Sequence, residues 1–195
     1  MNSLAPLIEE AQRVLAEAVR HFGLKVDPAS FVVTIHPAGA RQALGWFWAG
    51  RWANGVADKL NEINLSAEHL KGDVGEVLLH ELAHAENHAN GLKDCAGKVH
   101  NARFKAMAER LGLEVLPRDR RVGYGFTKRG PEADAFLASA GFKSEVFALV
   151  RGAEVSGKKG SRQRLWTCAC GVKVRVASDD FQATCGRCGG EFFRG

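Results

Sequence analysis

Three histidines stand four residues apart in the segment EVLLHELAHAENHANG, residues 76–91. Residues four apart share one face of a helix, so a helix would place His80 and His84 about one turn apart. Two imidazoles at this spacing can bind one Zn²⁺ ion, and Glu81 between them can reach a water on that ion. The pattern H-E-L-A-H therefore favours a hydrolytic zinc site over the alternative, a structural helix that happens to be rich in histidine.

The third histidine of the segment, His88, is a poor third ligand for the same ion. Along a straight helix it would lie about 12 Å from His80, at ~1.5 Å per residue. The longer zinc motif H-E-x-x-H-x-x-G-x-x-H is also excluded, because Asn87 and Asn90 occupy its Gly and His positions. A ligand from another element is therefore needed.

A catalytic zinc site takes three protein ligands and leaves a position open for water. His100 is the best candidate for the third ligand, because a turn at Gly91 would return the chain beside the first helix. Asp94 and Glu109 are weaker candidates. The alternative for His100 is an exposed position at the start of the next helix.

This set of residues predicts a hydrolytic mechanism. Zinc held by three neutral imidazoles keeps its positive charge and can lower the pKa of a bound water to about 7. Glu81 would take the proton as the water attacks a carbonyl carbon, and would deliver it to the leaving amine. Tyr124, the only tyrosine, could stabilise the oxyanion or could equally belong to the core.

A second metal site is predicted near the C-terminus, where four of the five cysteines lie in the last 28 residues. The candidate ligands are Cys168, Cys170, Cys185 and Cys188. The second pair, C-x-x-C followed by two glycines, is typical of a zinc-ribbon knuckle, whereas the first pair is the tighter C-x-C. So small a segment would have little core without a metal, which favours one structural Zn²⁺ over free thiols.

The net charge of +5 lies entirely in the C-terminal part of the chain. Residues 1–140 hold 17 basic and 17 acidic residues, whereas residues 141–195 hold 10 basic and 5 acidic residues. A basic patch suggests an acidic partner such as DNA, although a well-solvated tail explains the charge equally well. The candidates for phosphate contacts are Lys158, Lys159, Arg162, Arg164, Lys173, Arg175 and Arg187.

Hydrophobic periodicity predicts the elements that must position these residues. Helices are expected over 4–22, 73–90, 101–111 and 131–142, and strands over 31–36, 43–52 and 61–66. Asp73 and Glu76 have the spacing of a capping box at the start of the histidine helix. That helix is apolar around most of its circumference, so we expect it to be central and buried.

Composition divides the chain into a main domain over 1–150, a basic Gly/Ser-rich linker over 151–164 and a zinc ribbon over 165–195. No apolar run approaches the ~20 residues of a membrane span. The N-terminus lacks the basic start and apolar run of a signal peptide. We therefore expect no contact with a membrane, and a cytoplasmic or nucleoid-associated location.

A long run of residues resembles the SprT-like (Spartan-type) zinc metallopeptidase family. The run is GWFWAGRW…NEINLSAEHLKGDVGEVLLHELAHAEN…GKVHNARFKAMAERLGLEV, and the resemblance covers about residues 40–126. The histidine helix, the later His in HNARFK and the EINLS segment carry it. Members of this family commonly carry a cysteine ribbon after the core, as this chain does. The chain is similar to the short bacterial or phage-borne forms.

The resemblance implies a fold and a set of roles. It implies zinc ligands at His80, His84 and His100, with Glu81 as the catalytic residue. It also implies an α+β, zincin-like core, in which a small antiparallel or mixed sheet packs on the active-site helix and one strand lies along the substrate cleft. Proteolysis of DNA-bound proteins is the activity of the best-known members.

The leading hypothesis is therefore a zinc-dependent endopeptidase with one catalytic and one structural Zn²⁺, acting on protein substrates near DNA. One alternative is a non-catalytic DNA-binding module in which both zinc ions are structural. Another is a zinc hydrolase whose substrate is a non-peptide amide.

Overall fold

The computed structural model describes residues 3–37, 43–53, 55, 59–149, 151 and 163–195. The chain divides into two compact units, Met1–Gly152 and Ala153–Gly195. Most of the expected linker, residues 152–162, lies outside the described residues.

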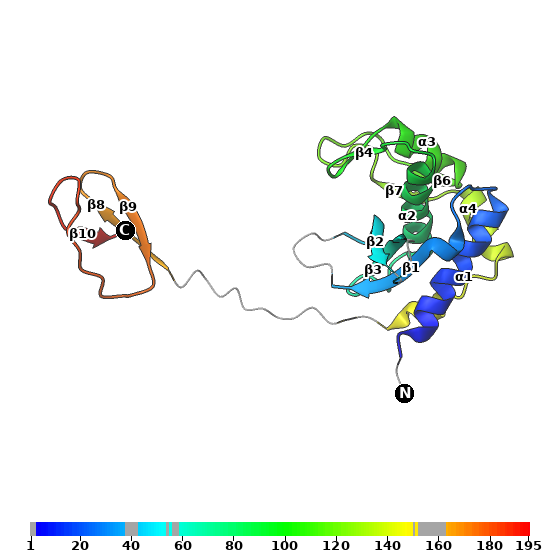
Figure 1. Cartoon of the computed structure of the whole chain (residues 1–195), viewed down its shortest axis with the longest axis horizontal. Coiled ribbons are helices and arrows are strands. Elements are labelled where there is room, and N and C mark those ends of the chain that lie inside the picture. The colour runs from blue at the N-terminus through cyan, green and yellow to red at the C-terminus, as the bar shows by residue number, and fades with distance from the viewer. Residues whose placement is uncertain (1–2, 38–42, 54, 56–58, 150, 152–162) are drawn as a thin grey trace. The chain divides into compact units, whose positions relative to one another are not determined.

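The first unit is a mixed α+β domain, which confirms the expected class (Figure 1). Its helices are α1 (Ala5–His21), α2 (Val74–Ala89), α3 (Ala102–Arg110) and α4 (Pro131–Ser139), with 3-10 turns at Pro28–Ser30 and Ser144–Ala148. Its strands are β1 (Phe31–His36), β2 (Gly45–Ala53), β3 (Lys59–Ser66), β4 (Cys95–Ala96), β5 (Val99–His100), β6 (Leu113–Val115) and β7 (Thr127–Arg129).

The main sheet of this unit has the strand order β1-β3-β2. β3 runs parallel to β1 and antiparallel to β2, so the sheet is mixed. The register pairs Val33 with Ile63, and both side chains are buried. Because alternate residues of a strand share a face, this face of the sheet also buries Phe31 and Leu65.

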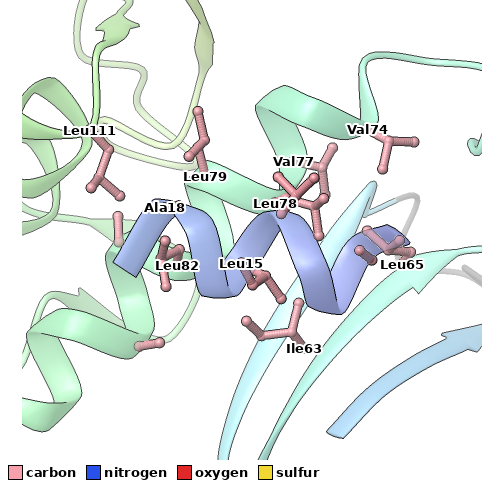
Figure 2. Close-up of a cluster of buried hydrophobic side chains, with 14 of the residues drawn as sticks. Leu15, Ala18, Ile63, Leu65, Val74, Val77, Leu78, Leu79, Leu82 and Leu111 are labelled. Atoms are coloured by element: carbon pink, nitrogen blue, oxygen red, sulfur yellow. The ribbon is translucent and has the colours of Figure 1, made fainter. Parts of the chain in front are cut away.

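The central element is α2, which is buried around most of its circumference, as its sequence predicts. Asp73 caps it by accepting a hydrogen bond from the Glu76 backbone N–H at 3.0 Å, the first half of the predicted capping box. Leu15 and Ala18 of α1 meet Leu78 and Leu82 of α2 above Ile63 of the sheet (Figure 2). This packing fixes one side of α2 and leaves its histidines on the side toward β5 and β7.

A buried carboxylate ties the end of α2 to the chain that leaves α1. Glu86 is 1% exposed, and its Oε2 accepts hydrogen bonds from the backbone N–H groups of Lys25 at 2.9 Å and Val26 at 3.0 Å. Its Oε1 accepts a hydrogen bond from Asn90 at 2.8 Å. Glu86 therefore satisfies backbone groups that helix packing would otherwise leave without partners.

The second unit contains a small antiparallel sheet. Its strands are β8 (Arg164–Cys168), β9 (Lys173–Val176) and β10 (Phe192–Arg194), in the order β10-β8-β9. Trp166 is 8% exposed and lies 5.6 Å from Phe181, centre to centre. This apolar cluster is too small to be a core of ordinary size.

No helix in the described part of the chain is long and apolar enough to cross a membrane.

Candidate metal centre

The three predicted ligands converge in the first unit. His80 and His84 lie one turn apart on α2, and His100 ends β5 immediately before α3. Their candidate ligand atoms all lie within 4.8 Å of one another. The Nε2 atoms of His84 and His100 are 3.1 Å apart. The structure therefore brings one residue from beyond the Gly91 turn, His100, together with the two from the helix.

The other ring nitrogen of each histidine is engaged by the protein. His84 Nδ1 lies 2.8 Å from Asp94 Oδ2, and His100 Nδ1 lies 3.0 Å from the Val122 carbonyl oxygen. His80 Nδ1 lies 2.9 Å from the Thr127 hydroxyl oxygen. A carboxylate and a carbonyl can only accept, so His84 and His100 carry their proton on Nδ1.

This arrangement fits a metal ion. With the protons on Nδ1, the Nε2 atoms of His84 and His100 present lone pairs toward each other at 3.1 Å. Such an approach is repulsive unless a cation lies between them. Two nitrogens bound tetrahedrally to zinc at ~2.05 Å would stand about 3.3 Å apart, close to the distance observed.

His100 is held in place by the glycine-punctuated segment that follows α3. The backbone N–H of His100 donates to the Val122 carbonyl at 2.9 Å, and its own carbonyl accepts from the Tyr124 N–H at 3.1 Å. A Cβ atom on Gly123 would lie 2.0 Å from the His100 carbonyl oxygen, and one on Gly125 would lie 2.4 Å from His100 Nδ1. Both glycines are therefore required by the close approach of the backbone to His100.

Phe104 of α3 forms the apolar floor under the three rings. It is fully buried, and its ring centre lies 4.6 Å from that of His80, 4.7 Å from His84 and 4.4 Å from His100. An apolar floor lowers the local dielectric and thereby strengthens electrostatic interactions at the site.

Glu81 is buried beside this centre. It is 4% exposed, and burial raises its pKa to about 7, although the backbone N–H of Phe47 and the charge on His84 favour the ionised form. A Cβ atom on Gly45 would lie 3.3 Å from Glu81 Oε1, so β2 passes directly over the carboxylate. A carboxylate with a pKa near neutrality can both accept and release a proton.

The neutral form that binds metal is favoured for two of the three histidines, His80 and His100. Burial lowers the pKa of His80 well below its usual value, and the neighbouring His84 and His100 lower it further. Burial also lowers the pKa of His100. Burial opposes the protonation of His84, but its hydrogen bond to Asp94 and the nearby Glu81 charge outweigh that effect and raise its pKa.

The centre opens into a cavity of about 870 Å³. Residues 43–47, at and before the start of β2, line one side, and Val122 and residues 125–127 are among those on its wall. Three large apolar side chains that line it are exposed, namely Leu44 at 48%, Leu92 at 40% and Phe126 at 44%. Exposed apolar side chains gathered around one concave site are typical of a ligand-binding surface.

The remaining candidates in this unit are not part of the three-histidine cluster. His88 lies at the cavity wall, with its ring centre 5.8 Å from that of Phe47. Asp94 contacts His84 Nδ1, and Glu109 pairs with Lys105 on α3 at 3.7 Å. Tyr124 is not among the described residues that line the cavity, and Lys105 Nζ lies 5.4 Å from its ring centre. Its position gives no support to a role as oxyanion donor.

The four C-terminal cysteines also converge. Their sulfur atoms lie within 4.8 Å of one another, and the Sγ distances are 3.2 Å for Cys168 to Cys188, 3.6 Å for Cys168 to Cys170 and 3.7 Å for Cys170 to Cys185. Sulfurs bound tetrahedrally at ~2.3 Å would stand about 3.8 Å apart, so the donor set fits one metal ion. A hydrogen bond from the Arg187 backbone N–H lowers the pKa of Cys185 to about 7, which favours the thiolate.

The predicted phosphate contacts are only partly within the described residues. Lys158, Lys159 and Arg162 lie outside them. Arg164 forms an ion pair with Asp179. Lys173, Arg175 and Arg187 are exposed, the first two on β9.

Sequence reasoning missed the groups that orient the histidines. Thr127 and the Val122 carbonyl lie 47 and 22 residues from the histidines they contact, and no spacing rule links them. Asp94 was expected as an alternative ligand, whereas it binds the far side of a ligand. The only local signal is the pair of glycines in VGYG. Such glycines indicate that the backbone passes close to another group, but they do not identify that group as His100.

Residues 32–121 match the model of the SprT-like family. Neither a curated protein nor a solved structure matches the chain. The matched region spans the main sheet, α2 and α3, and therefore contains His80, Glu81, His84 and His100. This match supports the resemblance to the SprT-like family, and it suggests that the first unit is a metallopeptidase-like domain.

Proposed function

We propose that the chain is a zinc-dependent endopeptidase in which Glu81 activates the attacking water. The convergence of His80, His84 and His100 beside the buried Glu81 carries this proposal. The donor set consists of imidazole nitrogens from three positions, which suits zinc and leaves a coordination position for water. On this proposal the mixed sheet and α2 form a zincin-like core.

The mechanism assigns the proton transfers to one residue. A zinc ion held by the three histidines would supply Lewis acidity for water and for the carbonyl oxygen. Glu81 takes the proton from the water as it attacks the carbonyl carbon, and then delivers that proton to the leaving amine. Its pKa of about 7 suits both steps at neutral pH.

The cavity favours a peptide over a small amide as substrate. Residues 43–47 run along it, and β2 is paired with β3 on one side only among the described strands. An extended peptide can add to such a strand edge through backbone hydrogen bonds. The exposed Leu44 and Phe126 would then contact apolar side chains of the substrate.

The second unit supports a role near DNA. We propose that its four cysteines hold a structural zinc ion and that Lys173, Arg175 and Arg187 contact phosphates. The substrates would then be DNA-associated proteins in the cytoplasm or on the nucleoid. Because phosphate contacts release counterions, DNA affinity should fall steeply with salt.

Cleavage of a loosely folded protein by the zinc-loaded chain tests the proposal. We expect Glu81→Gln to reduce cleavage at least about 10³-fold while the zinc content stays unchanged, because only the proton carrier is lost. Cleavage by that variant at the parent rate would eliminate Glu81 as the base. DNA binding without hydrolysis by the parent under any condition would favour the alternative, a non-catalytic DNA-binding module.

A further inference from the structure

A second buried carboxylate lies beside the metal centre, and the proposed mechanism does not use it. Glu76 lies on α2 one turn before His80, is 9% exposed, and lines the same cavity. We infer that Glu76, acting through the Thr127 hydroxyl, is a positioning residue that holds His80 in the tautomer that binds metal. This inference rests on the metal site of the proposed function, but not on its peptidase activity.

The contact between Glu76 and His80 runs through a third side chain. The Thr127 hydroxyl donates a hydrogen bond to Glu76 Oε1, and its oxygen lies 2.9 Å from His80 Nδ1. The direct separation of Glu76 Oε1 from His80 Nδ1 is 4.0 Å, too long for a hydrogen bond. Thr127 at the start of β7 therefore links two residues of α2 that do not contact each other directly.

Which group donates in each of these hydrogen bonds follows from the number of protons that Glu76, Thr127 and His80 can share. A hydroxyl has one proton, and Thr127 gives it to Glu76 Oε1, which in the ionised carboxylate has no proton to return. The hydroxyl oxygen can then only accept from His80, so the imidazole proton lies on Nδ1. His80 Nε2 consequently keeps its lone pair and is the nitrogen left to bind a metal ion.

Of the three histidines, only His80 needs a second residue to fix its tautomer. Asp94 and the Val122 carbonyl contact Nδ1 of the other two histidines directly, and these acceptors fix the tautomer alone. A threonine hydroxyl can donate as well as accept, so Thr127 by itself would permit the wrong tautomer. Glu76 removes that ambiguity.

The chain offers a matched control on the same helix. Glu86 is also a buried carboxylate of α2, but it accepts its hydrogen bonds from the backbone N–H groups of Lys25 and Val26. Glu86→Gln should lower the unfolding midpoint and leave the histidines unaffected. Glu76→Gln should act on the histidines, because its amide can donate to Thr127 and so free the hydroxyl proton to point at His80 Nδ1.

The test uses the full chain and two readouts that do not depend on catalysis. Long-range ¹H–¹⁵N spectra of the protein stripped of metal at the histidine site report which nitrogen of His80 carries the proton. Competition with a chromophoric chelator reports zinc affinity, and the Co²⁺–thiolate absorption monitors the cysteine site separately. Thr127→Val, Thr127→Ser, Glu76→Gln and Glu86→Gln are compared with the parent.

We expect Thr127→Val and Glu76→Gln each to weaken zinc binding at the histidine site about 10–100-fold. Glu76→Gln should also move His80 from the Nδ1–H form toward a mixture. Thr127→Ser should retain the parent values, and so should Glu86→Gln. Parent affinity and an unchanged tautomer in Glu76→Gln would overturn the inference.

The outcomes separate this inference from the proposed function. An Nδ1–H tautomer of His80 that is lost in Glu76→Gln supports the positioning role even if the parent cleaves no protein. Conversely, an active peptidase whose His80 tautomer is insensitive to Glu76→Gln keeps the proposed function and rejects the positioning role. If Thr127→Val does not fold, Glu76→Gln and Thr127→Ser still decide between these outcomes.

Discussion

The identity of a metal ligand and its orientation come from different parts of this chain. His80 and His84 are recognisable as candidate ligands from a five-residue motif, because their spacing matches one helical turn. Their ring orientations depend on Thr127 and Asp94, which are distant in sequence. At the scale of the residue, the site should therefore be as sensitive to its supporting groups as to its ligands.

Gly125 gives the sharpest prediction of this kind. A Cβ atom there would lie 2.4 Å from His100 Nδ1 and 2.7 Å from its Cε1, so Gly125→Ala must displace the imidazole. We expect the variant to fold but to bind one metal ion fewer per chain than the parent, as measured by metal analysis after gel filtration. Gly186→Ala is the control, because an added Cβ atom there meets nothing within 4 Å. Full metal content in Gly125→Ala would mean that the backbone can yield at this point.

Glu81 gives a prediction about pH. Burial raises its folded-state pKa from 4.5 to about 7 in the metal-free protein, so the folded state holds more protons than the unfolded state between these values. Its contribution to stability is therefore lost as the pH rises from about 4.5 to 7. Glu81→Gln should be more stable than the parent at pH 8, by at most about 3 kcal/mol, and equal to it near pH 4. Urea unfolding of the metal-free proteins measures this difference, and equal stability at pH 8 would contradict it.

At the scale of the element, the sequence predicts the four α-helices and the three strands of the main sheet. α2 begins at the predicted cap, since Asp73 accepts from the Glu76 N–H, and α1 and α3 match their periodic stripes to within one or two residues. β1 and β3 lie where β-branched residues and alternation predict them. These features were predictable because their causes lie within a few neighbouring residues.

The pairing of the elements was not predictable in the same way. Nothing within the β1 or β3 segments indicates that they run parallel with β3 in the centre of the sheet, because that depends on how α2 and α1 pack on the sheet. β4 and β5 are two-residue strands, too short for any periodicity to reveal. His100 could thus be proposed as a ligand from its place in the chain, whereas its Val122 partner could not.

The apolar wall of the cavity makes a prediction about the substrate. Leu44 and Phe126 are exposed and line the cavity, whereas Leu116 is 39% exposed and does not line it. Truncation of Leu44 or Phe126 to Ala should raise KM for peptides with large apolar side chains, because ~1–2 kcal/mol of apolar contact is lost. The expected effect is about 5–30-fold. Initial rates on matched apolar and polar peptides measure it. A similar rise in KM from Leu116→Ala would show that the effect is not specific to the cavity wall.

At the scale of the whole molecule, the chain has two compact units, and each contains one of the two sets of metal ligands predicted from the sequence. The histidine set lies in a domain with an extensive apolar core, whereas the cysteine set lies in a unit with few buried apolar side chains. Metal loss should accordingly have different results. The first unit should remain folded, and the second should unfold.

Metal content tests this division directly. We expect two zinc ions per chain, of which His84→Ala removes one and Cys185→Ser removes the other. The near-ultraviolet circular dichroism of Trp166, buried in the second unit, should collapse in Cys185→Ser and persist in His84→Ala. A single zinc ion in the parent would eliminate one of the two sites.

The hydrogen bonds to the three Nδ1 atoms also have a kinetic consequence. Because Asp94, Thr127 and the Val122 carbonyl each contact one Nδ1 atom, the protein itself orients the three imidazoles, and loading of the histidine centre should require little rearrangement. Exchange there should be governed by diffusion through the open cavity, whereas exchange at the cysteines must wait for the small unit to open. A brief exposure to chelator should therefore abolish the proposed peptidase activity while the second unit stays folded. Added zinc should then restore that activity without refolding.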